Sequence, residues 1–209
     1  MAHAPLVLVA HSSVGIKSVR ELIELAKAKP GKLNYASSGA GTTSFLAAEL
    51  FKYMTKVQMV HVPYKGAGAA AAAVVAGQVD LVATTPNAVV PHVRTGRLRA
   101  LGVTSATRLS IIPEVPTIAE QGLPGYEVVT AEDGEDGLAK ASLSRPDLII
   151  SDLMMPRMDG WRLLEELRAS PSLRDVPVIL LTDRREAEER VRGLVLGADD
   201  YISKDVLMD

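Results

Sequence analysis

The sequence predicts an α/β protein in which parallel sheets are flanked by helices. Short β-rich runs alternate with helical patterns along the 209 residues, and this alternation is typical of parallel strands joined by crossover helices. Several runs, such as "LVLVAH" and "VPVILLT", are almost continuously aliphatic, as strands covered on both faces are. The connections between such strands are expected to be right-handed.

The expected strands are short runs of β-branched, aliphatic and aromatic residues that recur along the whole chain. In chain order they cover Leu6–His11, Leu33–Ser37, Gln58–Tyr64, Asp80–Thr85, Leu98–Ser105, Tyr126–Ala131, Leu148–Asp152, Val176–Thr182 and Asp200–Lys204.

The expected helices carry apolar residues at helical spacing. The first, over residues 18–32, begins with Ser18 as its N-cap and stops at the pair Pro30-Gly31. The same pattern predicts helices over residues 42–54, 160–170 and 185–198.

Composition excludes several classes of partner. The net charge is −2, the pI is near 6.1 and the basic residues form no long cluster, so we expect no nucleic-acid partner. The chain has no cysteine, which excludes disulfides and thiolate metal sites. No apolar run approaches the roughly 20 residues of a membrane span. The start lacks the basic region of a signal peptide, so we expect a cytoplasmic protein without membrane association.

The pattern also predicts that the chain is not an enzyme and has neither a cofactor nor a metal site. The four histidines, His3, His11, His61 and His92, are dispersed. They form neither a Ser/His/Asp triad nor the spacing of a zinc site.

Four motifs occur in order in the first part of the chain: "PGKLNYASSGAGTTSFLAAELF", "HVPYKGAGAA", "GQVDLVATTPNAVVPHVRTGRLRALGVTSATR" and "IIPEVPTIAEQGLPGYE". Together they resemble the substrate-binding proteins of tripartite tricarboxylate transporters, from about Pro5 to Glu127. The resemblance implies a periplasmic parent whose two lobes close on a small carboxylate. We expect one such lobe here.

The stretch "SSGAGTTS" is a glycine-rich turn from a strand into a helix. Glycines let a ligand approach the backbone, and free N–H groups at a helix start attract anions. The residues alone favour a plain helix cap. The resemblance implies instead that Ser38, Gly39, Gly41, Thr42 and Thr43 hold a ligand carboxylate. The stretch Pro63–Gly68 is a second turn that fits either interpretation.

Two departures from this family make the lobe more apolar. Phe45 stands where the family commonly has histidine, and the helix in "GAGAAAAAVVAGQ" is less polar than its counterpart. A new packing partner and ordinary family variation both remain open as explanations.

The second part of the chain contains "VVTAEDGEDGLAKASLSRPDLIISDLMMPRMDGWRLLEELRAS" and then "VPVILLTDRREAEERVRGLVLGADDYISK". This part resembles the flavodoxin-like receiver domain of bacterial response regulators, from about Gly125 to Lys204. The resemblance implies a cytoplasmic parent in which Asp152 accepts a phosphoryl group, Thr182 senses it and Lys204 pairs with it. Tyr201 matches the switch aromatic.

One element of the receiver is absent. Phosphoryl transfer in receivers needs Mg²⁺, which prefers several hard oxygen ligands, and the family supplies them from an acidic pair that closes its first strand. Here the upstream strand 98–105 and the helix 116–123 imitate the missing unit and are expected to complete the receiver sheet. Thr104 and Ser105 replace the acids. Neutral hydroxyls cannot hold Mg²⁺ in this way, so we expect Asp152, Thr182 and Lys204 to be vestigial.

The sequence therefore predicts a chimera, engineered or recombined, of a binding-protein lobe (residues 1–125) and a receiver fragment (residues 126–209). Its junction lies at "GYEV", where both families have a turn followed by a strand. We expect no cellular function. The alternatives are weak capture of a small carboxylate and phosphorylation at Asp152. The sequence leaves open whether the halves share one sheet, and whether open sheet edges produce a homodimer by strand exchange.

Overall fold

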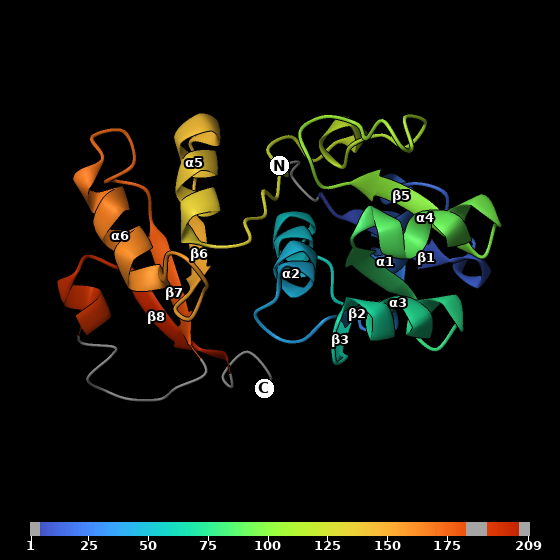
Figure 1. Cartoon of the computed structure of the whole chain (residues 1–209). Helices are drawn as coiled ribbons and strands as arrows, with labels where there is room; N and C mark the ends of the chain where they lie inside the picture. The colour runs from blue at the N-terminus through green and yellow to red at the C-terminus, as the bar shows by residue number, and fades with distance from the viewer. Residues whose placement is uncertain (1–4, 183–191, 205–209) are drawn as a thin grey trace. The chain divides into compact units, whose positions relative to one another are not determined.

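The computed structural model describes residues 5–182 and 192–204, and the chain divides into two compact units (Figure 1). Unit 1 runs to Val129 and unit 2 begins at Thr130. Each unit has its own sheet, with helices packed against it. The predicted fold class is confirmed, and the halves do not share a sheet.

Unit 1 is built on a five-stranded sheet with the order β3-β2-β4-β1-β5. All of its strands lie within predicted runs. They are β1 (Val7–His11), β2 (Asn34–Ser37), β3 (Val60–Pro63), β4 (Leu81–Thr84) and β5 (Leu98–Val103). Strand β2 is parallel to both β3 and β4. The carboxyl ends of β2 and β3 therefore meet at one edge of the sheet.

One strand of unit 1 runs against the prediction of a parallel sheet. Strand β1 is antiparallel to both of its neighbours, β4 and β5. Val7, Val9 and Ala10 are completely buried, which is why the run "LVLVA" is uniformly apolar. Since burial on both faces produces the same aliphatic run in either direction, the sequence pattern carries no information about strand direction.

The helices of unit 1 are α1 (Val19–Ala28), α2 (Thr43–Thr55), α3 (Ala67–Val75) and α4 (Pro86–Arg94). Ser18 caps α1 as predicted, because its hydroxyl accepts a hydrogen bond from the Glu21 N–H at 3.1 Å. Three alanines of α3, Ala70, Ala71 and Ala73, are buried in one cluster with valines of β1 and β4. Core packing inside unit 1 therefore explains the apolar α3 without a new partner.

Unit 2 has a three-stranded parallel sheet with the order β6-β7-β8. Its elements are α5 (Gly134–Ser144), β6 (Ile149–Asp152), α6 (Gly160–Ala169), β7 (Val178–Thr182) and β8 (Asp200–Ser203). Residues 192–195 are helical, and most of the rest of the helix predicted over 185–198 lies outside the described residues. In the described part of both units, every helix is too short or too polar to cross a bilayer.

Three expectations about the junction are wrong: two concern strands and one concerns a helix. Strand β5 pairs with β1 in unit 1, so residues 98–105 do not complete the second sheet. The run 126–131 is not a strand. Tyr126 is buried in unit 1, where its hydroxyl donates to the Ala47 carbonyl at 2.8 Å, and the Val128 N–H donates to the Thr104 carbonyl at 3.0 Å. These contacts hold the segment in unit 1, where it does not form a receiver strand.

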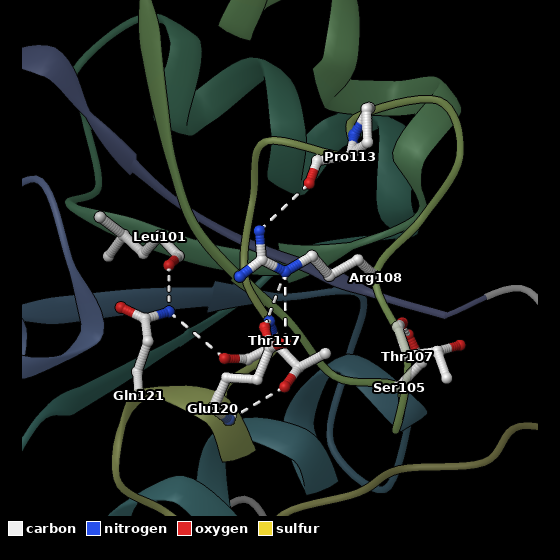
Figure 2. A network of polar contacts seen from close by, with 8 residues as sticks. All are labelled: Leu101, Ser105, Thr107, Arg108, Pro113, Thr117, Glu120 and Gln121. Atoms are coloured by element: carbon white, nitrogen blue, oxygen red, sulfur yellow. Dashed lines mark hydrogen bonds and ion pairs between the residues drawn. The ribbon is translucent and has the colours of Figure 1, made fainter.

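The helix expected over residues 116–123 is a single 3-10 turn, η2 (Ala119–Gln121). Figure 2 shows the polar network that holds it. Thr117 and Glu120 cap each other: Thr117 N–H donates to the Glu120 carboxylate at 2.8 Å, and Glu120 N–H donates to the Thr117 hydroxyl at 3.0 Å. Gly122 then ends the turn with a φ of 99°.

Candidate functional site

The predicted binding turn connects β2 to α2 at the carboxyl end of the sheet. Strand β2 ends at Ser37 and α2 begins at Thr43. Gly39 has a φ of 128° and Gly41 a φ of 71°, both values that L side chains adopt only with strain. The two glycines are therefore needed for the path of the turn, and all five predicted binding residues lie within it.

Hydroxyl groups tie the turn to the first residues of α2. Thr42 donates from its hydroxyl to the Gly39 carbonyl at 2.6 Å. The Ser44 hydroxyl accepts from the Ser38 N–H at 2.9 Å and lies 2.9 Å from the Ser38 hydroxyl. Ser44 is buried and was not among the predicted site residues. The sequence feature that indicates Ser44 as a site residue is its position at the end of the motif "SSGAGTTS".

The first three backbone N–H groups of α2 have no hydrogen-bond acceptor among the described residues. Thr42 occupies the N-cap position, but its side chain makes no capping hydrogen bond. Within the described residues, the N–H groups of Thr43, Ser44 and Phe45 make no hydrogen bond. Such donors at a helix start carry the positive end of the helix dipole. The plain-cap interpretation therefore does not account for this turn.

The second glycine turn lies beside the first. The Tyr64 N–H donates to the Ser37 carbonyl at 2.9 Å, which joins the ends of β2 and β3. Gly66 precedes α3 with a φ of 98° and provides no side-chain cap. The predicted turn Pro63–Gly68 thus meets the Ser38–Ser44 turn at the same edge of the sheet.

A histidine that sequence reasoning did not place in the site lies directly under the turn. His61 Nε2 is 2.6 Å from the Ser37 hydroxyl. The ring stacks on Tyr35, with centroids 5.0 Å apart, and touches Phe45, with centroids 4.8 Å apart. Phe45, the departure from the first family, therefore packs inside unit 1. Burial lowers the pKa of His61 from its ordinary value of 6.5.

The three predicted receiver residues meet at the carboxyl edge of the second sheet. Asp152 ends β6, Thr182 ends β7, and Lys204 follows β8. Lys204 Nζ donates to Asp152 Oδ2 at 2.7 Å, and the Met154 N–H donates to Asp152 Oδ1 at 3.2 Å. The structure thus brings the predicted acceptor and its lysine together.

The donor set around Asp152 does not fit Mg²⁺. Among residues 5–182 and 192–204, no group of three or more His, Cys, Asp or Glu side chains could hold a metal ion. Thr104, expected to replace one acid, is completely buried in unit 1, where its hydroxyl accepts from the Leu6 N–H at 3.0 Å. Ser105 donates to the Thr107 carbonyl at 2.8 Å. In the described residues Asp152 therefore belongs to no cluster of three metal-binding side chains, and its carboxylate is already paired with Lys204.

Comparison with protein families gives two matches. The model of the tripartite tricarboxylate transporter family receptor matches residues 1–131, and that of the response regulator receiver domain matches residues 114–209. The two matches overlap over residues 114–131, which contain the predicted junction.

Curated relatives resemble either part separately. A UPF0065 protein in the tcbD-tcbE intergenic region of Pseudomonas sp. is 42% identical over 130 residues, which are 62% of this chain and 39% of that protein. The probable transcriptional regulator ycf27 of Cyanophora paradoxa is 48% identical over 80 residues, 38% of this chain and 32% of that protein. The chain thus spans well under half of each of these relatives.

Solved structures match unit 1. R. palustris Rpa4515 with adipate has a TM-score of 0.60 and 39% identity, over 62% of this chain and 43% of that one. MatC from Rhodopseudomonas palustris with bound malate has a TM-score of 0.58 and 32% identity, over 61% of this chain and 43% of that one.

Proposed function

The chain belongs to the tripartite tricarboxylate transporter receptor family through its first 131 residues, which are joined to a receiver domain, and from this premise we propose that it is a recombined fold whose remaining activity is weak capture of a small carboxylate. The observation that carries the proposal is the turn Ser38–Ser44. It leads into a helix whose first three N–H groups have no partner among the described residues.

The ligand class follows from the donors of the turn. Backbone N–H groups at a helix start bind an anion without an obligatory positive side chain. Two structures similar to unit 1 hold adipate and malate, and both ligands are small dicarboxylates. We therefore assign a dicarboxylate of this size to the turn, with one carboxylate at α2.

The affinity is expected to be low because the matched structures are more than twice as long as the part shared with this chain. A single lobe supplies about half of the contacts and no closure over the ligand. We expect a Kd of about 1 mM, which corresponds to about −4 kcal/mol.

A pair of substitutions at one position tests this function. Gly41 has a left-handed φ of 71°, which Asn and Asp tolerate better than other residues. Gly41→Asp places a carboxylate in the turn and should weaken adipate binding at least tenfold, whereas the neutral Gly41→Asn should bind within about threefold of the parent chain. Equal binding by both variants and the parent would place the ligand elsewhere.

Phosphorylation at Asp152 is the second candidate, supported by the 2.7 Å contact between Lys204 and Asp152. It is opposed by the absence, in the described residues, of any group of three or more His, Cys, Asp or Glu side chains that could hold a metal ion, because the negative charge of the transferred phosphoryl group would be neutralised by Mg²⁺ held on such ligands. We expect no phosphoryl addition from acetyl phosphate and Mg²⁺ by intact mass spectrometry. A single addition that Asp152→Asn abolishes would establish the receiver activity instead.

Self-association through β6 is a further part of the proposal. In the described residues β6 has one strand neighbour, β7. The N–H groups of Ile149 and Leu153 donate towards β7, so the Ile150 N–H points to the other edge. Sedimentation equilibrium should detect a dimer that Ile150→Pro weakens, since proline removes that donor. A monomer at all concentrations would contradict pairing through this edge.

A further inference from the structure

A continuous path of polar contacts leads from His61 to the glycine-rich turn. We propose that His61 is a positioning residue for this turn. Through the Ser37 hydroxyl it controls the hydrogen bonding of the Gly39 backbone, and it thereby couples anion binding to pH. The coupling to anions rests on the proposed carboxylate binding, whereas the positioning role does not.

The Ser37 hydroxyl is the centre of the path. Ser37 is completely buried, and its Oγ lies 2.6 Å from His61 Nε2, 3.1 Å from the Gly39 nitrogen and 3.1 Å from the Gly39 carbonyl oxygen. A hydroxyl has one proton to donate and accepts from up to two donors. When His61 Nε2 carries a proton and donates, Ser37 is free to donate to the Gly39 carbonyl. When the neutral ring carries its proton on Nδ1, Nε2 has none, so Ser37 donates to His61 and the Gly39 carbonyl loses its bond to Ser37.

The His61 ring is held in place, so its protonation acts on Ser37 rather than on ring position. Tyr35 stacks on one side at an angle of 21°, and Phe45 from α2 packs against it at 50°. Tyr35 donates to Glu49, and Lys52 donates to the same carboxylate oxygen at 2.6 Å. Tyr35, Glu49 and Lys52 are the titratable groups that face His61, and the mutual pairing of Glu49 and Lys52 offsets their charges.

Protonation of His61 and anion binding are linked equilibria, and this linkage gives the direction of the pH dependence. Burial holds the pKa of His61 below its ordinary 6.5, so the ring is neutral at pH 7. As the pH falls through that lowered pKa, Nε2 becomes a fixed donor and a positive charge appears beside Phe45, in the first turn of α2. An anion at this helix start favours the charged ring. Binding therefore raises the His61 midpoint, and by reciprocity the anion binds more tightly at lower pH.

The first arm of the test needs no ligand and uses the full chain. NMR titration from pH 8 to pH 4 should show the amides of Ser38 and Gly39 shifting with the midpoint of the His61 ring. His61→Gln keeps a neutral side chain that can donate to Ser37, so it should retain the fold and lose this titration. His92→Gln is the matched control, because His92 lies on α4, and it should leave the titration unchanged. The positioning role would be overturned if the chemical shifts of the turn amides did not change while His61 titrates. It would also be overturned if these shifts changed with pH equally in His61→Gln.

The second arm adds adipate at several pH values. We expect the His61 midpoint to rise by about half a unit, which corresponds to binding about threefold tighter below the midpoint than above it. Binding that is independent of pH would overturn the coupling. Absence of adipate binding at every pH would overturn the proposed function and the coupling together, and the first arm would still decide the positioning role.

Discussion

At the scale of single residues, the binding turn depends on glycines whose backbone other residues cannot adopt without strain. Gly39→Ala, at a φ of 128°, should destabilise unit 1 by about 1–2 kcal/mol and weaken adipate binding. Gly68 is the control: it lies in α3, and an added Cβ would have nothing within 4 Å. Gly68→Ala should stabilise by about 0.5–1 kcal/mol. Urea unfolding measures both, and equal effects of the two substitutions would show that the turn is unstrained.

The sequence identified several residues whose spatial grouping the structure bears out. Ser38, Gly39, Gly41, Thr42 and Thr43 share one turn, and Asp152 and Lys204 are in contact. Their roles towards a ligand or a phosphoryl group stay predictions. The contact of His61 with Ser37 could not be predicted. It depends on the register in which Tyr35 pairs with His61 across β2 and β3. The register of two paired strands cannot be read from a single sequence.

At the scale of elements, the segment around η2 contains a carboxylate that makes stability depend on pH. The Thr117 N–H, and then the Arg108 guanidinium, hold the pKa of Glu120 below its ordinary 4.5 (Figure 2). A carboxylate with a depressed folded pKa contributes stability above the unfolded pKa and loses it as the pH falls through the folded value. Glu120→Gln should therefore lower the urea midpoint of unit 1 at pH 7, and this difference should shrink at pH 3.

The control for this substitution is Glu114→Gln, since Glu114 is exposed and makes no hydrogen bond within the described residues. It should change the midpoint little at either pH. If Glu120→Gln lowered the midpoint equally at pH 7 and pH 3, the stabilisation would not come from the charge of Glu120.

The segment after η2 is predicted to stabilise unit 1 rather than unit 2. The Tyr126 hydroxyl donates to the Ala47 carbonyl inside the protein, and a buried hydrogen bond contributes about 1 kcal/mol. Tyr126→Phe should reduce the stability of unit 1 by about this amount, measured by hydrogen exchange of the α2 amides. Tyr53→Phe is the control, because Tyr53 is 71% exposed. Faster exchange in unit 2 instead would show that Tyr126 supports the receiver part.

Hydrophobic patterns predicted most elements correctly, since burial and periodicity follow directly from the sequence. They failed at β1, whose direction leaves no trace in an aliphatic run, and at residues 126–131. The run "YEVVTA" has the composition of a strand, but the burial of Tyr126 and the Val128 hydrogen bond hold it in unit 1. Tertiary contacts outweigh strand propensity there.

At the scale of the whole molecule, two families meet in one chain without sharing a sheet. The family matches overlap at residues 114–131, and the structural division follows Val129. The sheet of unit 1 has five strands, whereas the sheet of unit 2 has β6, β7 and β8 in the described residues. The unit with the larger sheet also carries the turn that we propose as the anion site, so binding rather than signalling is the activity we propose.

The most direct test of this account is a residue-resolved NMR titration of the full chain with adipate at neutral pH. We predict saturable shifts of the amides from Gly41 to Phe45, with a Kd of about 1 mM, and no comparable shifts around Asp152. Micromolar affinity, shifts confined to unit 2, or no shift at about 20 mM adipate, roughly twenty times the expected Kd, would contradict the assignment of weak carboxylate capture to the turn between β2 and α2.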